Sequence, residues 1–361
     1  MVLKKWIGGM AGLLAILIRW LLGSSPALAE TWYASGLFPI IRGFLDRTLL
    51  QLPFPTVYVF LLGLVGLLFF VVRQALIKKK CIPGSILLVF RGIVNVFGWI
   101  VFSFFFLWGF NYYRIPLYSQ LSLTPEPLSL VLTLEEMKLT ESGLRSLRSE
   151  IAADSMPLAY SENFRTWENR LKMEMKSVLT ALNYPMPGHP TVKPLYPAGF
   201  MRRMGIFGIY FPFTGEGYLD PSLHPIEKVF TLAHELAHGF GVTDEGEANF
   251  VAWLVCSQSS DVFSRYAGEL KLFRYQLNDL FRMDRDAYEQ FIAAMATDIR
   301  MDIREIQQHN LEILPYFREL SRRSNDLYLK SQGIKAGVKS YAQLPMLARA
   351  WRINSGKQDP P

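Results

Sequence analysis

Two histidines four residues apart carry the clearest chemical pattern in this sequence. His234 and His238 stand at positions i and i+4, and Glu235 directly follows the first histidine. On a helix, side chains with this spacing leave the same face about 5–6 Å apart at Cβ, so both imidazoles can bind one zinc ion. Glu235 lies one step around the helix, where it can accept a proton from water. This HExxH arrangement predicts two metal ligands and a general base.

A catalytic zinc ion needs a third protein ligand, and three carboxylates follow the histidines. Asp244 and Glu247 have the D-x-x-E spacing of a helix capping box, which gives both a structural purpose. Glu245 is left in the first turn of that helix, so we favour it as the third ligand. Asn249 shares its face and is expected to support the site by hydrogen bonding. Asp244, in a metzincin-like HExxHxxGxxD spacing, and Glu247 stay open as alternative third ligands.

The sequence also offers candidates for an oxyanion donor and for a substrate-binding strand. Zincins often use an additional side chain to stabilise the oxyanion, and the candidates are Tyr218, Tyr328 and Tyr341. The ordinary expectation for each is a core or surface tyrosine, and the sequence does not choose among them. The stretch GIFGIYFPFTGEGYLDPS predicts two short strands around a turn. The first strand fits an ordinary core strand and also a cleft edge that pairs with an extended peptide.

The elements that must position this site follow a long apolar region. Hydrophobic residues form 50% of the 361 residues, with the excess concentrated at the N-terminal end. Segments 57–77 and 86–110 are each long enough to cross a bilayer, which takes about 20 residues. A segment over about 6–22 precedes an A-x-A sequence, so it is either a signal peptide or a first membrane helix. We therefore expect a membrane region over 1–115 with two or three helices.

Lysines beside the apolar segments predict the orientation. Lys4, Lys5 and the run Lys78–Lys80 belong in the cytoplasm by the positive-inside rule. The chain after Asn111 is then extracytoplasmic, as expected for a multi-pass membrane protein. The net charge is +7, but the sequence shows no basic stripe with interleaved aromatic residues. The lipid bilayer, and not nucleic acid, is therefore the expected partner.

The predicted fold is an α-rich membrane protein. Its second part, residues 116–350, is expected to be a mainly helical α+β zincin domain with a small β-sheet next to the HExxH helix. Residues 351–361 are expected to form a flexible tail. The oligomeric state is not indicated by any sequence feature.

Family resemblance sharpens the interpretation. The E-x-x-A-N pattern from Glu245 to Asn249 resembles the E-x-x-A-D of membrane-bound gluzincin peptidases, with Asn249 standing where those relatives have Asp. More closely, the chain resembles an uncharacterised bacterial family of membrane-anchored zincins of the DUF3810 type, a domain of unknown function. The matching pieces run from about residue 32 to 345 and include WYASGLFPIIRGFL, WGFNYYRIPL, GEGYLD, AHELAHGFG and DEGEANFVAWL. This resemblance implies a zincin fold, a peptidase class and a location in a bacterial inner membrane, but no substrate.

The predicted function is hydrolysis of a peptide or protein substrate with one Zn²⁺ per chain. Zinc activates the attacking water, and Glu235 acts as the general base. The alternative is a non-catalytic membrane-anchored module with a structural or vestigial zinc site, although such a site has no need of Glu235. An intramembrane protease is disfavoured because charged residues flank only about fifteen less polar residues around the motif, too few to span.

Overall fold

The computed structural model describes residues 3–77, 82–152, 158, 162–185 and 188–356. The chain forms two compact units. Unit 1 comprises Met1–Ile115 with Pro187–Pro190 and Phe211–Glu216, and unit 2 comprises the rest. The Lys78–Lys80 run, on which the predicted orientation depends, lies outside the described residues.

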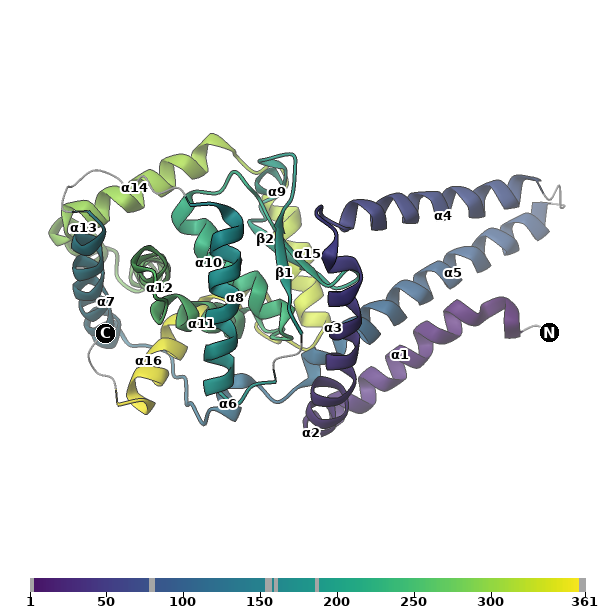
Figure 1. Cartoon of the computed structure of the whole chain (residues 1–361), viewed down its shortest axis with the longest axis horizontal. Helices are drawn as coiled ribbons and strands as arrows, with labels where there is room; N and C mark the ends of the chain where they lie inside the picture. The colour runs from purple at the N-terminus through teal and green to yellow at the C-terminus, as the bar shows by residue number, and fades with distance from the viewer. Residues whose placement is uncertain (1–2, 78–81, 153–157, 159–161, 186–187, 357–361) are drawn as a thin grey trace. The chain divides into compact units, whose positions relative to one another are not determined.

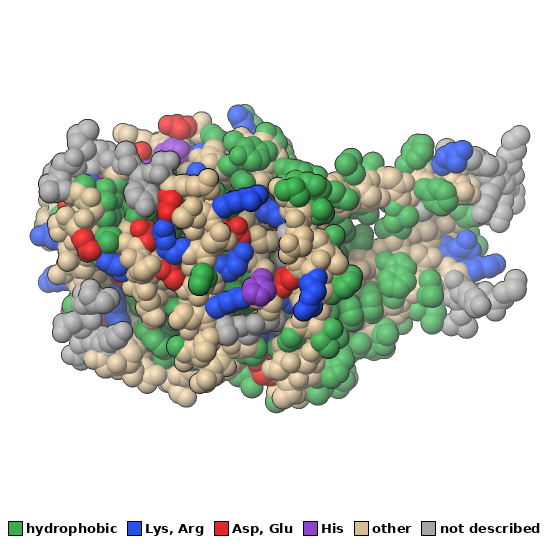
Figure 2. Space-filling model, in the orientation of Figure 1, with side chains coloured by type: hydrophobic (Ala, Val, Ile, Leu, Met, Phe, Trp, Pro, Cys, Tyr) green, Lys and Arg blue, Asp and Glu red, His purple; other side chains and the backbone are tan. Residues whose placement is uncertain are grey.

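Unit 1 holds three helices that are long and apolar enough to cross a membrane, by length and composition. They are α1 (Ile7–Ser24), α4 (Val57–Ile77) and α5 (Ile82–Leu107). Exposed hydrophobic side chains run along these helices in Figure 2, whereas charged side chains are spread over the surface of unit 2. The three predicted apolar segments are therefore confirmed as helices. The shorter elements of unit 1 are η1 (Leu3–Trp6), α2 (Pro26–Leu28), η2 (Ala29–Leu37), α3 (Phe38–Arg47), η3 (Leu49–Gln51) and η4 (Gly109–Tyr113).

Helix α1 packs closely on α5 through glycines. A Cβ on Gly12 would lie 2.7 Å from the Cα of Gly98, and one on Gly98 would lie 2.1 Å from the carbonyl oxygen of Gly8. Small residues at such crossings let two helix backbones approach, as in membrane helix pairs. At the start of α1, the Asn95 side chain accepts hydrogen bonds from the N–H groups of Gly8 (3.0 Å) and Gly9 (3.2 Å). These bonds satisfy two donors that lack partners within the helix.

The A-x-A sequence lies inside continuous helical structure. Ala27 is in α2, and Ala29 begins the π-helical turn η2 and is 0% exposed. One residue later, Glu30 forms an ion pair with Arg114, with 2.6 Å between Nη2 and Oε1. The segment on both sides of this sequence is therefore integrated into unit 1.

Unit 2 is mostly helical, and most residues of a three-stranded sheet with strand order β1-β3-β2 belong to it. The strands are β1 (Thr191–Pro194), β2 (Gly208–Phe211) and β3 (Glu216–Leu219). The helices are α6 (Leu117–Gln120), α7 (Leu130–Ile151), α8 (Phe164–Ala181), α9 (Phe200–Arg203), α10 (Pro225–Gly239), α11 (Glu245–Ser257), α12 (Val262–Met283), α13 (Arg285–Ala294), α14 (Thr297–Glu312), α15 (Arg318–Ser331), η5 (Gly337–Gln343) and α16 (Leu344–Asn354). Helix α16 therefore continues past residue 351, where we expected the tail to begin. The mostly helical content and the small sheet agree with the predicted fold class (Figure 1).

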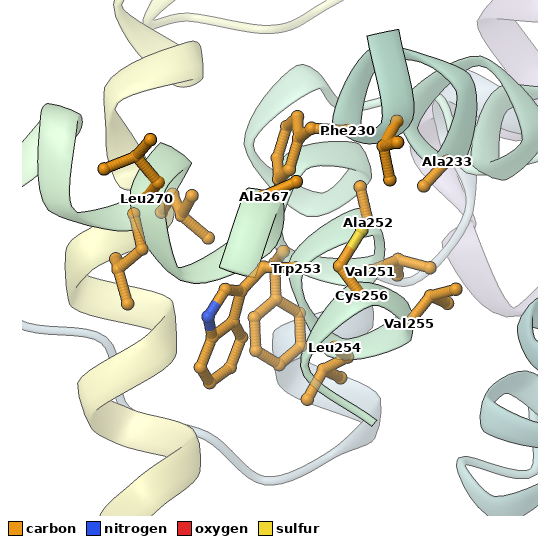
Figure 3. Packing of buried hydrophobic residues seen from close by; sticks show 14 of the residues in the cluster. Phe230, Ala233, Val251, Ala252, Trp253, Leu254, Val255, Cys256, Ala267 and Leu270 are labelled. Atoms are coloured by element: carbon orange, nitrogen blue, oxygen red, sulfur yellow. The ribbon is translucent and has the colours of Figure 1, made fainter. Parts of the chain in front are cut away.

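Helices α10, α11 and α12 pack around a common apolar core. Figure 3 shows Phe230 from α10, Trp253 and Cys256 from α11, and Leu270 from α12 within this cluster. Gly268 of α12 lets the helices approach, because a Cβ there would lie 2.5 Å from the Cβ of Cys256. The close packing fixes α10 against α11, and these two helices carry the predicted ligands.

Candidate metal site

Helix α10 is anchored at its N-terminus. Pro225 occupies the first turn, where its missing N–H costs nothing, and the Nδ1 atom of His224 accepts a hydrogen bond from the N–H of Ile226 at 3.3 Å. Glu227 accepts hydrogen bonds from Arg274 (2.8 Å) and Asn310 (3.0 Å). These contacts set the position of the motif along the helix.

A tight turn then brings α11 back toward the histidines. Gly241 has φ of 93°, a left-handed conformation that suits glycine after a helix. Asp244 caps α11 by accepting hydrogen bonds from the N–H groups of Gly246 (2.8 Å) and Glu247 (3.1 Å). Glu245 is the first residue of α11, and its side chain extends to both histidines.

Three acceptor atoms converge in unit 2. The Nε2 atoms of His234 and His238 lie 3.1 Å apart, and Oε2 of Glu245 lies 3.1 Å from the first and 3.2 Å from the second. Among the described residues, these three form the one group of His, Cys, Asp or Glu with the spacing of metal ligands. Ligands about 2.0–2.1 Å from one tetrahedral ion lie roughly 3.3 Å apart. The donor set therefore fits a metal ion such as zinc.

The backbone orients one of the two imidazoles. Nδ1 of His238 lies 2.7 Å from the carbonyl oxygen of Val242. A carbonyl only accepts, so Nδ1 carries the proton, and in the neutral ring the lone pair that can bind a metal is on Nε2. Metal-binding histidines commonly show this arrangement. Val242 belongs to the turn between α10 and α11, directly before the helix that begins with Glu245.

The charges of the site depend on one another. Burial lowers the pKa of His234. Burial also disfavours the charged form of His238, but the Glu245 carboxylate outweighs it and raises the pKa of His238 to about 9. Burial raises the pKa of Glu245, yet the imidazoles, His238 above all, outweigh it and hold that pKa well below its usual range. A cation and a proton therefore compete for these ligands.

Glu235 lies beside the ligands against the sheet. Its side chain is buried, and burial raises its pKa to about 8. Two glycines make room for it: a Cβ on Gly208 of β2 would lie 2.4 Å from its Oε1, and one on Gly217 of β3 would lie 3.0 Å from its Cβ. Its Oε2 has no hydrogen-bond partner within the described part of the chain. In the ionised form of Glu235, such an oxygen can accept a proton.

Tyr341 is the predicted tyrosine that the structure places at the site. Its ring stacks on that of His234, with centroids 6.3 Å apart and an interplanar angle of 20°. Burial, the charge of Glu245 and a hydrogen bond to that carboxylate raise the pKa of Tyr341 well above its usual value. Asn249 donates hydrogen bonds to the backbone carbonyl of Tyr341 (3.1 Å) and to the hydroxyl of Tyr275 (3.3 Å). Asn249 thus reaches the ligands through Tyr341.

The remaining predicted residues are not part of the group of converging ligand atoms. Oε1 of Glu247 accepts a hydrogen bond from the N–H of Tyr118 at 3.4 Å, and Asp244 serves as the cap described above. Neither carboxylate joins the two histidines. Tyr218 is buried on β3, and Tyr328 lies on α15.

Sequence reasoning missed two residues of α12 near the site. Lys271 lies over the rings of Phe230 and Tyr275, 5.3 and 5.5 Å from their centroids. Burial, followed by the neighbouring Arg274, lowers the pKa of Lys271 to about 8. Neither Lys271 nor Tyr275 stands at a motif spacing from the histidines, so their positions emerge only from helix packing.

The fold and the site define a class: a mostly helical protein with three candidate membrane helices and a buried His-His-Glu group that could hold a metal. The chain belongs to the family described as protein of unknown function (DUF3810), whose model matches residues 33–348. No curated protein and no solved structure matches it. The family description carries no activity, so any activity must be argued from the site.

Proposed function

We propose that this chain is a membrane-anchored zinc metallopeptidase. The observation that carries the proposal is the position of Glu235, a buried base on the helix that supplies two of the three converging ligand atoms. His234, His238 and Glu245 would hold the ion. Zinc, when bound, supplies a Lewis acid that polarises the scissile carbonyl and makes water more acidic.

Glu235 performs the proton transfers in this mechanism. Its Oε2 takes a proton from the water whose oxygen attacks the carbonyl carbon. The same carboxyl then gives that proton to the amine nitrogen as the C–N bond breaks. A carboxyl group buried between α10 and the sheet keeps its proton from bulk water between these two steps.

Other residues of the site would hold the substrate and the ligands in place. Strand β2 is at one edge of the sheet, and its Gly208 contacts Glu235. An extended peptide that pairs with this edge would present its carbonyl near the base. Tyr341 positions His234 by stacking and Glu245 by hydrogen bonding.

We further infer that α1 is retained as a membrane helix and that unit 2 is extracytoplasmic. The close glycine packing of α1 on α5 and the helical A-x-A sequence support retention. The lysines at positions 4, 5 and 78–80 support the orientation by the positive-inside rule. Three spans then place the chain after Ile115 on the side opposite the N-terminus.

The substitution Glu235→Gln tests the proposed function. It keeps the shape of the side chain but removes the proton acceptor, and the three ligands are unchanged. We expect the bound zinc to persist and hydrolysis of a peptide library to fall by at least about 10²-fold. Glu245→Gln should lose zinc and hydrolysis together, and Glu135→Gln on the exposed surface of α7 is the matched control.

Two outcomes would contradict the proposal. If Glu235→Gln hydrolyses peptides at the wild-type rate, Glu235 is not the base. If the wild type binds zinc firmly and cleaves no peptide, the chain is a non-catalytic module with a structural zinc site.

A further inference from the structure

Helix α15 exposes an apolar stripe. Leu320 and Leu327 are seven residues apart, so they lie on one face of the helix, and they are 63% and 69% exposed. Phe317, directly before the helix, is also exposed. Large apolar side chains gathered on one exposed face commonly mark an interaction surface.

The same segment is strongly basic. Residues 318–339 hold six basic and two acidic side chains, a net charge of +4. The basic residues are Arg318, Arg322, Arg323, Lys330, Lys335 and Lys339, and the acidic ones are Glu319 and Asp326. Hydrogen bonds from Arg322 and Arg323 lower the pKa of Glu319 to about 2, so this carboxylate is ionised at neutral pH, and the net charge of +4 already includes its negative charge.

Four of these cations surround one cavity of about 400 Å³. It is lined by Arg322, Lys330, Lys335 and Lys339, with Asp326 as the acidic side chain. Asp326 organises the cavity: its Oδ2 lies 2.6 Å from Nζ of Lys330, and its Oδ1 accepts a hydrogen bond from the N–H of Val338 at 3.1 Å. Asp326 pairs with Lys330 and Glu319 pairs with Arg322, so the positive excess that suits an anion comes from Lys335 and Lys339.

We propose that α15 and the turn after it bind the anionic headgroups of a phospholipid bilayer. The cavity accepts a headgroup phosphate, while Leu320 and Leu327 contact the boundary of the acyl chains. A helix with an apolar stripe flanked by Lys and Arg is suited to this position, and basic clusters favour anionic lipids. The chain carries three helices that are long and apolar enough to cross a membrane, and anchoring by such helices would raise the local concentration of lipid headgroups around this surface. The proposal does not rest on the peptidase chemistry, although Asn325 of α15 donates a hydrogen bond to the hydroxyl of Tyr341 at 3.3 Å.

A fluorescent label on the full-length chain tests this proposal. Ser324→Cys places an environment-sensitive dye on the exposed side of α15, with Cys81→Ser preventing a second label; Cys256 is buried. The protein is placed in nanodiscs of phosphatidylcholine alone or mixed with phosphatidylglycerol. We expect a blue shift and quenching by spin-labelled lipid in the anionic discs, and high salt should reverse both.

Variants separate the two parts of the surface. Lys335→Gln with Lys339→Gln should lower the ratio of lipid-bound to unbound α15, as the attached label reports it, by about tenfold or more in anionic discs. The reason is that each surface cation raises the binding constant for anionic lipid by roughly a factor of five. Leu320→Ser with Leu327→Ser should reduce quenching by the lipid. Lys138→Gln with Arg165→Gln, which removes two exposed charges from α7 and α8, should change neither signal.

Two results would overturn the proposal. Identical emission in neutral and anionic discs would show that the surface does not bind lipid headgroups. If inorganic phosphate shifts the emission in neutral discs while phosphatidylglycerol does not, the cavity takes a free phosphate and not a bilayer.

Discussion

At the scale of single residues, Tyr341 connects two parts of the site. It stacks on His234 and hydrogen-bonds to Glu245, and its backbone carbonyl accepts a hydrogen bond from Asn249. These residues come from α10, α11 and η5. The position of Asn249 therefore matters to the ligands through Tyr341, and an amide is suitable there because the contact requires a donor.

Tyr341→Phe should weaken zinc binding while the fold stays intact. The ring remains stacked on His234, but the hydrogen bond to Glu245 is lost. Loss of such a supporting contact typically lowers metal affinity by about 10–100-fold, which a competition titration with a chelator measures. Tyr288→Phe on α13 removes a hydroxyl away from the site and should leave the affinity unchanged. Equal affinities for wild type and Tyr341→Phe would show that the hydroxyl does not support the ligand.

The local part of the site could be predicted from the sequence, and the remote part could not. His234, Glu235 and His238 are related by helical spacing alone. Glu245 could be predicted as a ligand from the capping pattern. Asp244 and Glu247 match a capping box, so Glu245 is the carboxylate in the first turn that has no capping role. Tyr275 lies on α12, and its position depends on how α12 packs on α10 and α11. No residue spacing in the sequence predicts this packing.

At the scale of elements, the loop between β3 and α10 depends on one carboxylate. Asp220 is fully buried and accepts hydrogen bonds from the N–H groups of Gly199 (2.8 Å), Arg202 (3.1 Å) and Ser222 (2.9 Å). The hydroxyl of Ser222 donates a further one at 2.7 Å. Burial disfavours the charge of Asp220, but these hydrogen bonds outweigh burial and lower its pKa. The loop that leads into the motif helix is thereby held in place.

Asp220→Asn should destabilise the protein at neutral pH by about 1–3 kcal/mol, the usual cost of losing hydrogen bonds to a buried charged group. The pKa is lower in the folded chain, so the stabilisation is fully present above the unfolded pKa. It is lost as the pH falls through the folded pKa. Thermal unfolding in detergent should therefore show a gap between variant and wild type at neutral pH that narrows in acid. The exposed Asp286→Asn is the control, and a gap that does not change with pH would contradict this account.

Long sequence patterns were sufficient to predict helices. The apolar segments near 57–77 and 86–110 became α4 and α5 because length and composition alone decide such helices. The glycine contacts of α1 with α5 could not be anticipated, since they depend on the crossing of two helices. For the same reason, the room that Gly208 leaves for Glu235 is visible only in the folded chain.

At the scale of the whole molecule, the proposal requires unit 2 to be on the far side of the membrane from the lysine-rich segments. A reporter enzyme that is active only outside the cytoplasm should be active when fused after Gln120 and inactive when fused after Lys80. The physical reason is that positively charged loops are retained in the cytoplasm. The reverse pattern of activity would overturn the extracytoplasmic location.

The zinc content of the purified full-length chain tests the central claim most directly. Elemental analysis after zinc is supplied should give about one zinc per chain, as three converging ligands predict. His234→Ala with His238→Ala should remove it, whereas His189→Ala, a histidine outside the site, should retain it. A wild-type chain that holds no more zinc than the double variant would contradict the metal site and the hydrolysis proposed for it.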